Sequence, residues 1–204
     1  EYKNQRMTKK EPLIKFIGIS KSFGRKKVLS DLNLEIYENE LFGLLGRSGS
    51  GKSTLLKILL GNYLPDKGRI FFRGKDITGN PDYLKKLVGL TTQENSFYEK
   101  LTVYENMIYY ANLYKINKNG KDIESHIKKI LSKVLLDNAS NTLADNLSGG
   151  MKRRLDFAIS IIHEPSLLIL DEPTTGLDPL LVLQFWEIVK KMNKTTIIIS
   201  HILP

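Results

Sequence analysis

Short runs of consecutive apolar residues alternate along this chain with stretches in which apolar residues recur every three or four positions. The short runs predict buried strands, and they lie at residues 41–45, 88–93, 166–170 and 195–200. The periodic stretches predict helices, and they lie at residues 53–61, 103–136, 151–163 and 179–192. Buried strands separated by helices indicate an α/β fold whose core sheet is largely parallel.

The first part of the chain has a different pattern. Residues 13–24 and 28–41 alternate between apolar and polar positions, as half-buried strands do, with a turn expected at Arg25–Lys27. Residues 69–77 form a similar segment of strand and turn. We therefore expect an antiparallel β subdomain in this part of the chain.

The pattern also predicts how the chain is organised. We expect a single domain over residues 1–204, with a core made of about 13–92 and 158–204 that includes the β subdomain. An α-helical subdomain is expected as an insertion at about 93–157. We also expect these residues to be a piece of a longer polypeptide.

Composition narrows the class of protein. The 204 residues are 41% apolar and contain no cysteine, which suits one globular domain and excludes disulfides and thiolate metal sites. No apolar run approaches the ~18 residues of a membrane span, and the first residues are polar and charged. We therefore expect a protein of a reducing, ATP-containing compartment that does not itself span a membrane.

The formal net charge of +9 raises the question of an acidic partner. The lysines are spread along the chain, and their densest run, from Lys115 to Lys133, lies opposite a helical apolar stripe. This stripe is formed by Ile123, Ile127, Ile130, Leu131 and Val134. A solvated helix face is the favoured interpretation, a membrane-headgroup contact is an alternative, and no nucleic acid is expected.

One segment of the sequence indicates a phosphate-binding site. The sequence GRSGSGKS at 46–53 fits the pattern G-x-x-x-x-G-K-[ST] between a predicted strand and a predicted helix. Glycines let backbone N–H groups point at one anion, Lys52 adds a charge, and the Ser53 hydroxyl is a magnesium ligand. A glycine-rich turn before a core helix is the alternative. The candidate nucleotide-binding residues are Gly46, Arg47, Ser48, Gly49, Ser50, Gly51, Lys52, Ser53 and Thr54. The segment predicts a P-loop NTPase core that binds a nucleoside triphosphate with Mg²⁺.

A second segment, LSGGMKRR at 147–154, precedes the predicted helix at 151–163. Ser148 has the character of an N-cap, and Gly149 and Gly150 leave backbone amides uncovered, so this too is a candidate anion site at a helix start. Taken alone, it would be an ordinary helix cap.

Together with the apolar run and Asp-Glu-Pro at 171–173, these segments resemble the motifs of the ABC ATPase family, in that family's order. The resemblance extends from about Ile14 to His201. It implies that the segment at 147–154 of one subunit closes over ATP held by the P-loop of another. The expected assembly is thus a head-to-tail homodimer or heterodimer.

Two adjacent carboxylates, Asp171 and Glu172, follow directly on a predicted strand, where ligands of such sheets bind. Neighbouring residues of extended chain point to opposite sides, so the two carboxylates can serve different atoms. Asp171 is assigned to the magnesium ion held by Ser53, and Glu172 to the water that attacks the γ-phosphate. A solvated acidic turn is the alternative.

Four further residues match single positions of the family's motifs. The resemblance implies that Gln93 reaches magnesium and water, that His201 contacts the γ-phosphate, and that Asp178 lies at the dimer seam. Phe23 stands where the family has an aromatic residue that stacks on adenine. The alternatives are a surface glutamine, a strand-end histidine and a core phenylalanine. Stacking tolerates any base, which leaves GTP open as well as ATP.

Residues 151–156, the segment after Gln93 and residues 201–203 are similar to the branch that powers export of drugs, lipids, polysaccharides and small ions. We expect an ATP-hydrolysing subunit that drives transport through a transmembrane permease, at the cytoplasmic face of the cell membrane. Ser96, Phe97 and Tyr98 are expected to line the groove that receives this permease. The alternatives are a soluble ABC-type ATPase acting on ribosomes or DNA, and a module that binds ATP without hydrolysing it.

Overall fold

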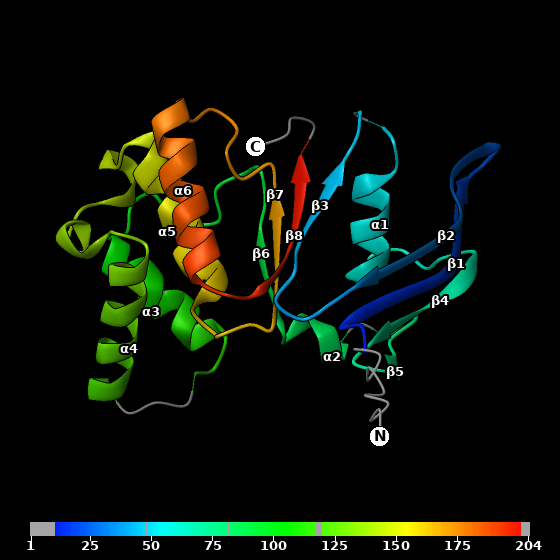
Figure 1. Ribbon diagram of the computed structural model, residues 1–204. Helices are drawn as coiled ribbons and strands as arrows, with labels where there is room; N and C mark the ends of the chain where they lie inside the picture. The colour runs from blue at the N-terminus through cyan, green and yellow to red at the C-terminus, as the bar shows by residue number, and fades with distance from the viewer. Residues whose placement is uncertain (1–10, 48, 81, 117–119, 201–204) are drawn as a thin grey trace, which may run out of the picture. The chain divides into compact units, whose positions relative to one another are not determined.

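The computed structural model describes residues 11–47, 49–80, 82–116 and 120–200. The chain forms two compact units (Figure 1). The smaller unit comprises residues 1–40 and 49–85, and the larger unit comprises residues 41–48 and 86–204. The α/β fold with a parallel sheet, an antiparallel β part and helices confirms the predicted fold class.

The smaller unit contains an antiparallel sheet with the strand order β2-β1-β4-β5. Its strands are β1 (Ile14–Phe23), β2 (Lys26–Ile36), β4 (Lys67–Phe72) and β5 (Lys75–Asp76). Ile14 pairs with Ile36 on one side and with Phe72 on the other, and all three side chains are buried. The alternating pattern of the sequence therefore gives one buried face, as predicted. Helices α1 (Lys52–Leu59) and α2 (Asp82–Lys85) complete this unit.

Two boundaries of the β strands differ from the sequence prediction. Strand β2 begins at Lys26, inside the predicted turn, and it ends at Ile36. The backbone turns at residues 38–39, where Asn39 has a φ of +62° and the Glu40 N–H donates to Tyr37 O. Asparagine tolerates this left-handed conformation, and the turn separates β2 from the strand that follows.

The larger unit contains a parallel sheet with the strand order β3-β8-β7-β6. Its strands are β3 (Leu41–Leu45), β6 (Val88–Thr91), β7 (Leu167–Asp171) and β8 (Thr195–Ser200). Residues 167–170 of β7 are all fully buried, as their unbroken apolar sequence predicts. The arrowheads of the four strands point the same way in Figure 1, so their carboxyl ends share one edge of the sheet.

Helices α3 (Val103–Leu113), α4 (Gly120–Lys133), α5 (Gly149–Ile161) and α6 (Pro179–Lys191) belong to the same unit, with the 3-10 turns η1 (Asp137–Ala139) and η2 (Ala144–Asn146). Side chains fix several helix starts. Thr102 and Glu105 form a capping box at α3, and Pro179 follows the N-cap Asp178 of α6. The predicted helical stretch at 103–136 is thus two helices.

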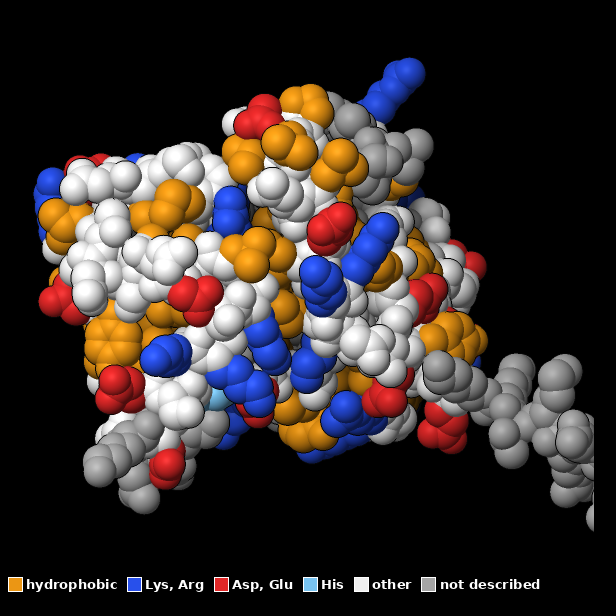
Figure 2. All heavy atoms as spheres, turned by 60° about the vertical axis from the view of Figure 1, so that its left-hand side comes forward, with side chains coloured by type: hydrophobic (Ala, Val, Ile, Leu, Met, Phe, Trp, Pro, Cys, Tyr) orange, Lys and Arg blue, Asp and Glu red, His pale blue; other side chains and the backbone are white. Residues whose placement is uncertain are grey.

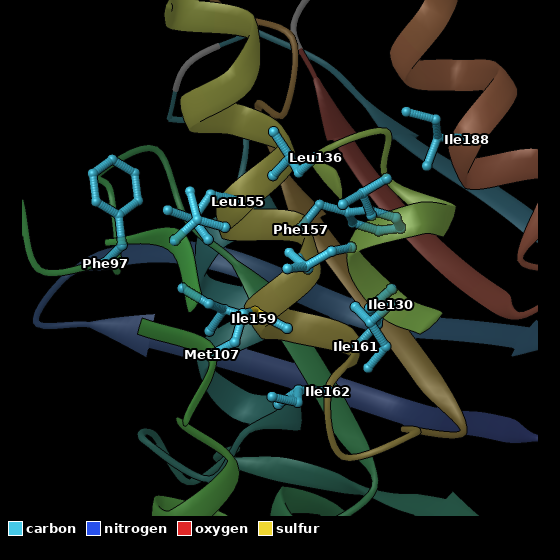
Figure 3. Packing of buried hydrophobic residues seen from close by; sticks show 14 of the residues in the cluster. Phe97, Met107, Ile130, Leu136, Leu155, Phe157, Ile159, Ile161, Ile162 and Ile188 are labelled. Atoms are coloured by element: carbon cyan, nitrogen blue, oxygen red, sulfur yellow. The ribbon is translucent and has the colours of Figure 1, made fainter. Parts of the chain in front are cut away.

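The helices bury a continuous apolar core in which α5 is central (Figure 3). Leu155, Phe157 and Ile159 of α5 lie in one cluster with Met107 of α3 and Ile130 of α4. The predicted apolar stripe of α4 faces this core, since Ile127, Ile130 and Leu131 are buried while Lys128 and Lys129 are exposed. No described helix combines the length and the hydrophobicity that a membrane crossing requires.

Helix α5 also approaches the sheet closely. A Cβ on Gly89 of β6 would lie only 2.1 Å from the backbone oxygen of Ser160. Only glycine therefore allows α5 to pack at this distance from β6. The position of α5 matters because its first residues belong to the second motif of the sequence.

Candidate functional site

The glycine-rich segment connects β3 to α1. Helix α1 begins after Gly51, whose φ of +99° is in the left-handed region, and no described side chain caps this helix. A Cβ on Gly51 would lie 3.0 Å from Leu29 Cδ2 and 3.2 Å from Val28 O, so both the backbone and the space require glycine. The start of α1 thus presents backbone amides rather than a side chain, as an anion site does.

The residues of this segment are divided between the two units. Gly46 and Arg47 belong to the larger unit, and residues 49–54 belong to the smaller one. Ser53 is exposed and Lys52 is half-buried. Ser48, which the sequence also assigns to this site, lies outside the described residues.

The acidic pair lies at the end of β7. Asp171 is the last residue of the strand, and Glu172 follows with a φ of +49° and a buried side chain. Its backbone N–H donates to Ile199 O at 3.0 Å. The hydroxyls of Ser200 and Thr175 each donate to Glu172 Oε2 at 3.4 Å. Glutamate rarely adopts this backbone conformation, so the neighbouring strand β8 and the turn after β7 hold the carboxylate in place.

Parallel strands bring several predicted residues to one edge of the larger unit. The registers pair Leu45 with Ser200, Ile199 with Asp171, and Leu170 with Thr91. Gly46, the acidic pair and Gln93 therefore all follow the carboxyl ends of adjacent strands, where ligands of α/β sheets bind. His201 follows β8 in the sequence, and it lies outside the described residues.

Gln93 is exposed, and its backbone is held by α5. Arg153 donates through Nη1 to Thr92 O at 2.9 Å and through Nη2 to Gln93 O at 3.2 Å. Asp156 accepts a hydrogen bond from Ser96 N–H at 2.7 Å. The sequence analysis assigned neither Arg153 nor Asp156 to the site. The charged residue within the apolar segment Leu-Asp-Phe-Ala was a signal, because a buried charge needs a hydrogen-bonding partner.

The second motif forms the start of α5, as predicted. Ser148 is the N-cap, and its Oγ accepts from Met151 N–H at 3.3 Å. Gly150 is buried, and a Cβ there would lie 2.9 Å from Leu181 Cδ1 of α6. Gly149 is exposed, and a Cβ there would meet no described atom within 4 Å. Packing against α6 thus explains why residue 150 is glycine, whereas no contact among the described residues requires glycine at position 149.

Asp178 caps α6, and its Oδ1 accepts from the N–H groups of Leu180 and Leu181 at 3.0 and 3.1 Å. Its side chain is exposed. The residue therefore has a structural role within the chain, which is compatible with the seam position that the resemblance assigns to it.

Phe23 is 44% exposed at the end of β1. Its ring packs edge-on against Tyr63 with the centroids 5.3 Å apart, and Lys21 Nζ lies 5.6 Å from its centroid. A core position is thus excluded for this ring, and stacking on a base stays a prediction.

The prediction that Phe97 lines a docking groove is wrong. Phe97 is only 7% exposed and belongs to the core cluster, where Figure 3 shows it beside α5. Tyr98, by contrast, is 48% exposed, and its ring lies 4.8 Å from that of Tyr109. The loop turns one aromatic residue inward and the next one outward, which a polar sequence context does not reveal.

A glycine-rich loop after one parallel strand and an acidic pair after another define the class of P-loop α/β nucleotide-binding domains. A comparison of the sequence with models of protein families identifies the family. The model described as ABC transporter matches residues 29–175, and this chain belongs to the ABC transporter family.

Curated relatives agree with this family. The chain is 38% identical over 193 residues to Nod factor export ATP-binding protein I of Rhizobium johnstonii, which covers 93% of this chain and 61% of the relative. It is 37% identical over 178 residues to ATP-binding cassette sub-family A member 6 of Mus musculus, covering 86% of this chain and 11% of that protein. The chain therefore spans about three fifths of the length of the Nod factor export protein.

Solved structures share the fold. CbiO1 of Clostridium perfringens, part of the ABC transporter complex cbiONQ, superposes with a TM-score of 0.86 at 27% identity over 94% of this chain and 79% of that chain. The ADP conformation of MJ1267, an ATP-binding cassette of an ABC transporter, gives a TM-score of 0.84 at 26% identity. It covers 95% of this chain and 82% of that chain.

Proposed function

We propose that this chain is the ATP-binding and ATP-hydrolysing part of an ABC transporter, and that the transporter exports its cargo. One observation carries the proposal: the parallel strands place the start of the glycine-rich loop, the acidic pair and Gln93 at one edge of the sheet. These are the groups that phosphate binding, water activation and metal contact require. The similarity to a Nod factor export ATP-binding protein supports export.

In this proposal the buried Glu172 carboxylate orients the attacking water and accepts its proton as the bond to the γ-phosphorus forms. The bond between the γ-phosphorus and the oxygen that bridges to the β-phosphate breaks, and ADP leaves with that oxygen. Inorganic phosphate is released, and Glu172 returns its proton to the phosphate or to solvent. The Ser200 and Thr175 hydroxyls donate to Oε2 and fix the orientation of this carboxylate. His201 is proposed to contact the γ-phosphate.

The residues present fit a magnesium ion. The Ser53 hydroxyl, the Asp171 carboxylate and the Gln93 amide are hard oxygen donors, the kind that Mg²⁺ prefers. When bound, the ion would neutralise charge on the phosphates.

Gly149 supports a composite site between two subunits. A Cβ at this glycine would meet no described atom within 4 Å, and Gly149 is the first residue of a helix whose amides can face an anion. We propose that the P-loop nucleotide of a second subunit approaches here, in a head-to-tail dimer. Asp178 would then lie at the seam.

The exposed ring pair Tyr98 and Tyr109 supports a docking surface for a transmembrane permease. The two hydroxyls are 3.1 Å apart, and both rings are more than two-fifths exposed. Exposed aromatic side chains are enriched in the energetically important parts of interfaces. The proposed location is therefore the cytoplasmic face of a membrane, with the chain bound to this permease.

The charge distribution does not favour nucleic acid as the partner. Figure 2 shows that basic side chains gather in the central and lower part of the viewed face, with acidic and apolar side chains among and around them. Lys128, Lys129 and Lys133 of α4 lie on its solvent side, opposite the apolar stripe. Neither arrangement is the continuous basic groove that tracks a phosphate backbone.

The substitution Glu172→Gln tests the proposal. We expect the purified chain to bind MgATP with wild-type affinity and to hydrolyse it at least ~10² times more slowly, because positioned proton transfer contributes about that factor. Loss of a negative charge beside the phosphates should also stabilise the ATP-bound dimer. Phosphate release, nucleotide binding and sedimentation measure the three effects. Turnover within a few-fold of wild type would remove Glu172 from the assigned role.

A further inference from the structure

The loop after β6 is attached to helix α5 by two side chains that lie three residues apart on that helix. Arg153 bonds the carbonyl oxygens of Thr92 and Gln93, and Asp156 bonds the N–H of Ser96. Residues at i and i+3 lie on one helix face, so the two side chains act on the loop from the same side. Their three hydrogen bonds hold the loop at Thr92, Gln93 and Ser96.

The two side chains that hold the loop are largely buried, whereas Thr92 and Gln93 of the loop are exposed. The Arg153 side chain is 11% exposed and the Asp156 side chain is 2% exposed. Charge-assisted hydrogen bonds in such surroundings are shorter and stronger than neutral ones, and a guanidinium can serve two carbonyls at once. Lysine offers a single point of charge and cannot reproduce this fork.

The pair is also electrostatically unusual. Asp156 Oδ2 has no hydrogen-bond partner among the described residues, and it lies 3.9 Å from Arg153 Nη1. Burial raises the pKa of the Asp156 carboxyl to about 6, against the opposing effects of the Ser96 N–H and the Arg153 charge. From α3, Tyr110 faces the same place, and its O–H donates to Ser96 O. A buried carboxylate of this kind is costly to fold, and its hydrogen bond to the Ser96 N–H gives it a role in holding the loop.

We propose that Arg153 and Asp156 are positioning residues that fix the Gln93 backbone to the start of the helix that carries Ser148 and Gly149. A displacement of α5 then moves Gln93 with it. This inference rests on the proposed function, because it assigns Gln93 a task in hydrolysis. The inference goes further than the proposed function in one respect: movement of α5 reaches the loop through the two hydrogen bonds of the Arg153 guanidinium group.

The test uses the full chain and combines two readouts. Hydrogen–deuterium exchange of the segment 92–98 reports the attachment without any need for hydrolysis. Turnover and MgATP affinity report its consequence. For Arg153→Ala and Asp156→Ala we expect exchange of this segment to rise about tenfold or more and kcat to fall about tenfold, while the Kd for MgATP changes less than twofold. Arg153→Lys should give intermediate exchange of this segment and an intermediate kcat. This variant replaces Arg153→Ala in the test if the alanine variant fails to fold.

Arg154 provides the matched control. It is the neighbouring arginine of the same helix, and its Nη1 donates to Leu135 O at 3.3 Å instead of to the loop. Arg154→Ala should leave exchange of segment 92–98 and kcat at wild-type values.

Three results would overturn the inference. The first is wild-type exchange of segment 92–98 in both Arg153→Ala and Asp156→Ala, and the second is increased exchange with unchanged kcat. Equal losses of kcat in Arg154→Ala and Arg153→Ala would show a general effect on α5 and would also overturn it. A wild-type chain that binds MgATP but does not hydrolyse it would overturn the proposed function instead, while the exchange data would still show whether the attachment exists.

Discussion

The Asp156 carboxyl illustrates how a single residue can oppose folding. Its pKa rises from 3.8 to about 6 because burial disfavours the charged form. Between these pH values the folded chain keeps a proton that the unfolded chain has lost. The contribution of Asp156 to the free energy of unfolding is therefore most favourable at pH ~4 and falls as the pH rises to about 6. Above that pH this contribution is constant. The shift of about two pKa units corresponds to about 3 kcal/mol.

Asp156→Asn should therefore stabilise the chain at neutral pH. The amide keeps an oxygen for the Ser96 N–H and removes the buried charge, so we expect the free energy of unfolding at pH 7.5 to rise by about 1 to 3 kcal/mol. The difference from wild type should shrink as the pH is lowered toward 4. Urea unfolding at several pH values measures both effects. A variant that is less stable than wild type at pH 7.5 would show that the carboxylate is net stabilising.

Single residues were also where sequence reasoning was least reliable. Arg153 contacts Gln93 and Asp156 contacts Ser96 across about sixty positions of sequence, and no local sequence pattern predicts such contacts. Phe97 and Tyr98 are adjacent, yet one is buried and the other exposed, because the loop backbone turns between them. By contrast, Ser148 and Asp178 are helix N-caps, whose chemistry is local and readable in the sequence.

At the scale of the elements, the sequence predicted the parallel strands and helices well, because their apolar patterns are strong. Strands β7 and β8 follow continuous apolar runs, and α6 follows its predicted stretch within one residue. The break between α3 and α4 was missed, because the periodic pattern continues on both sides of it. The finer division into a core and a helical subdomain at about 93–157 stays a prediction.

The two glycine environments of α5 lead to a prediction at this scale. Gly149→Ala should leave thermal stability unchanged or slightly raised, because the site is open and alanine favours helices by up to about 1 kcal/mol. Hydrolysis should nevertheless fall at least about tenfold, since the methyl group would obstruct the proposed approach of phosphate oxygens to the helix start. Thermal unfolding and phosphate release measure the two effects.

Gly89→Ala is the contrasting variant. Its Cβ would meet a backbone oxygen that cannot move away cheaply, so we expect clear destabilisation of the whole unit, of about 2 kcal/mol or more. If Gly149→Ala loses stability in the same way, Gly149 serves packing. If Gly149→Ala is stable and fully active, the proposed role of this glycine in the nucleotide site is wrong.

At the scale of the whole molecule, the proposed activity draws on both compact units. Lys52, Ser53 and Phe23 belong to the smaller unit, whereas the acidic pair, Gln93 and the Ser148 motif belong to the larger one. We therefore expect hydrolysis to need residues of both units, and the head-to-tail dimer proposed above to need two copies of the chain. The membership in the ABC transporter family supports this reading of the chain as one part of an assembly.

Mixing two inactive variants tests the composite site most directly. Lys52→Ala lacks the phosphate-binding charge, and Ser148→Arg blocks the opposing helix start. In a head-to-tail heterodimer of the two, one site pairs an intact P-loop with an intact Ser148 motif, so we predict that the mixture regains ATP hydrolysis that neither variant has alone. Lys52→Ala mixed with the double variant Lys52→Ala/Ser148→Arg contains no intact site and should stay inactive. An inactive first mixture in which heterodimers are shown to form would contradict the account, and so would full-rate hydrolysis by isolated monomers.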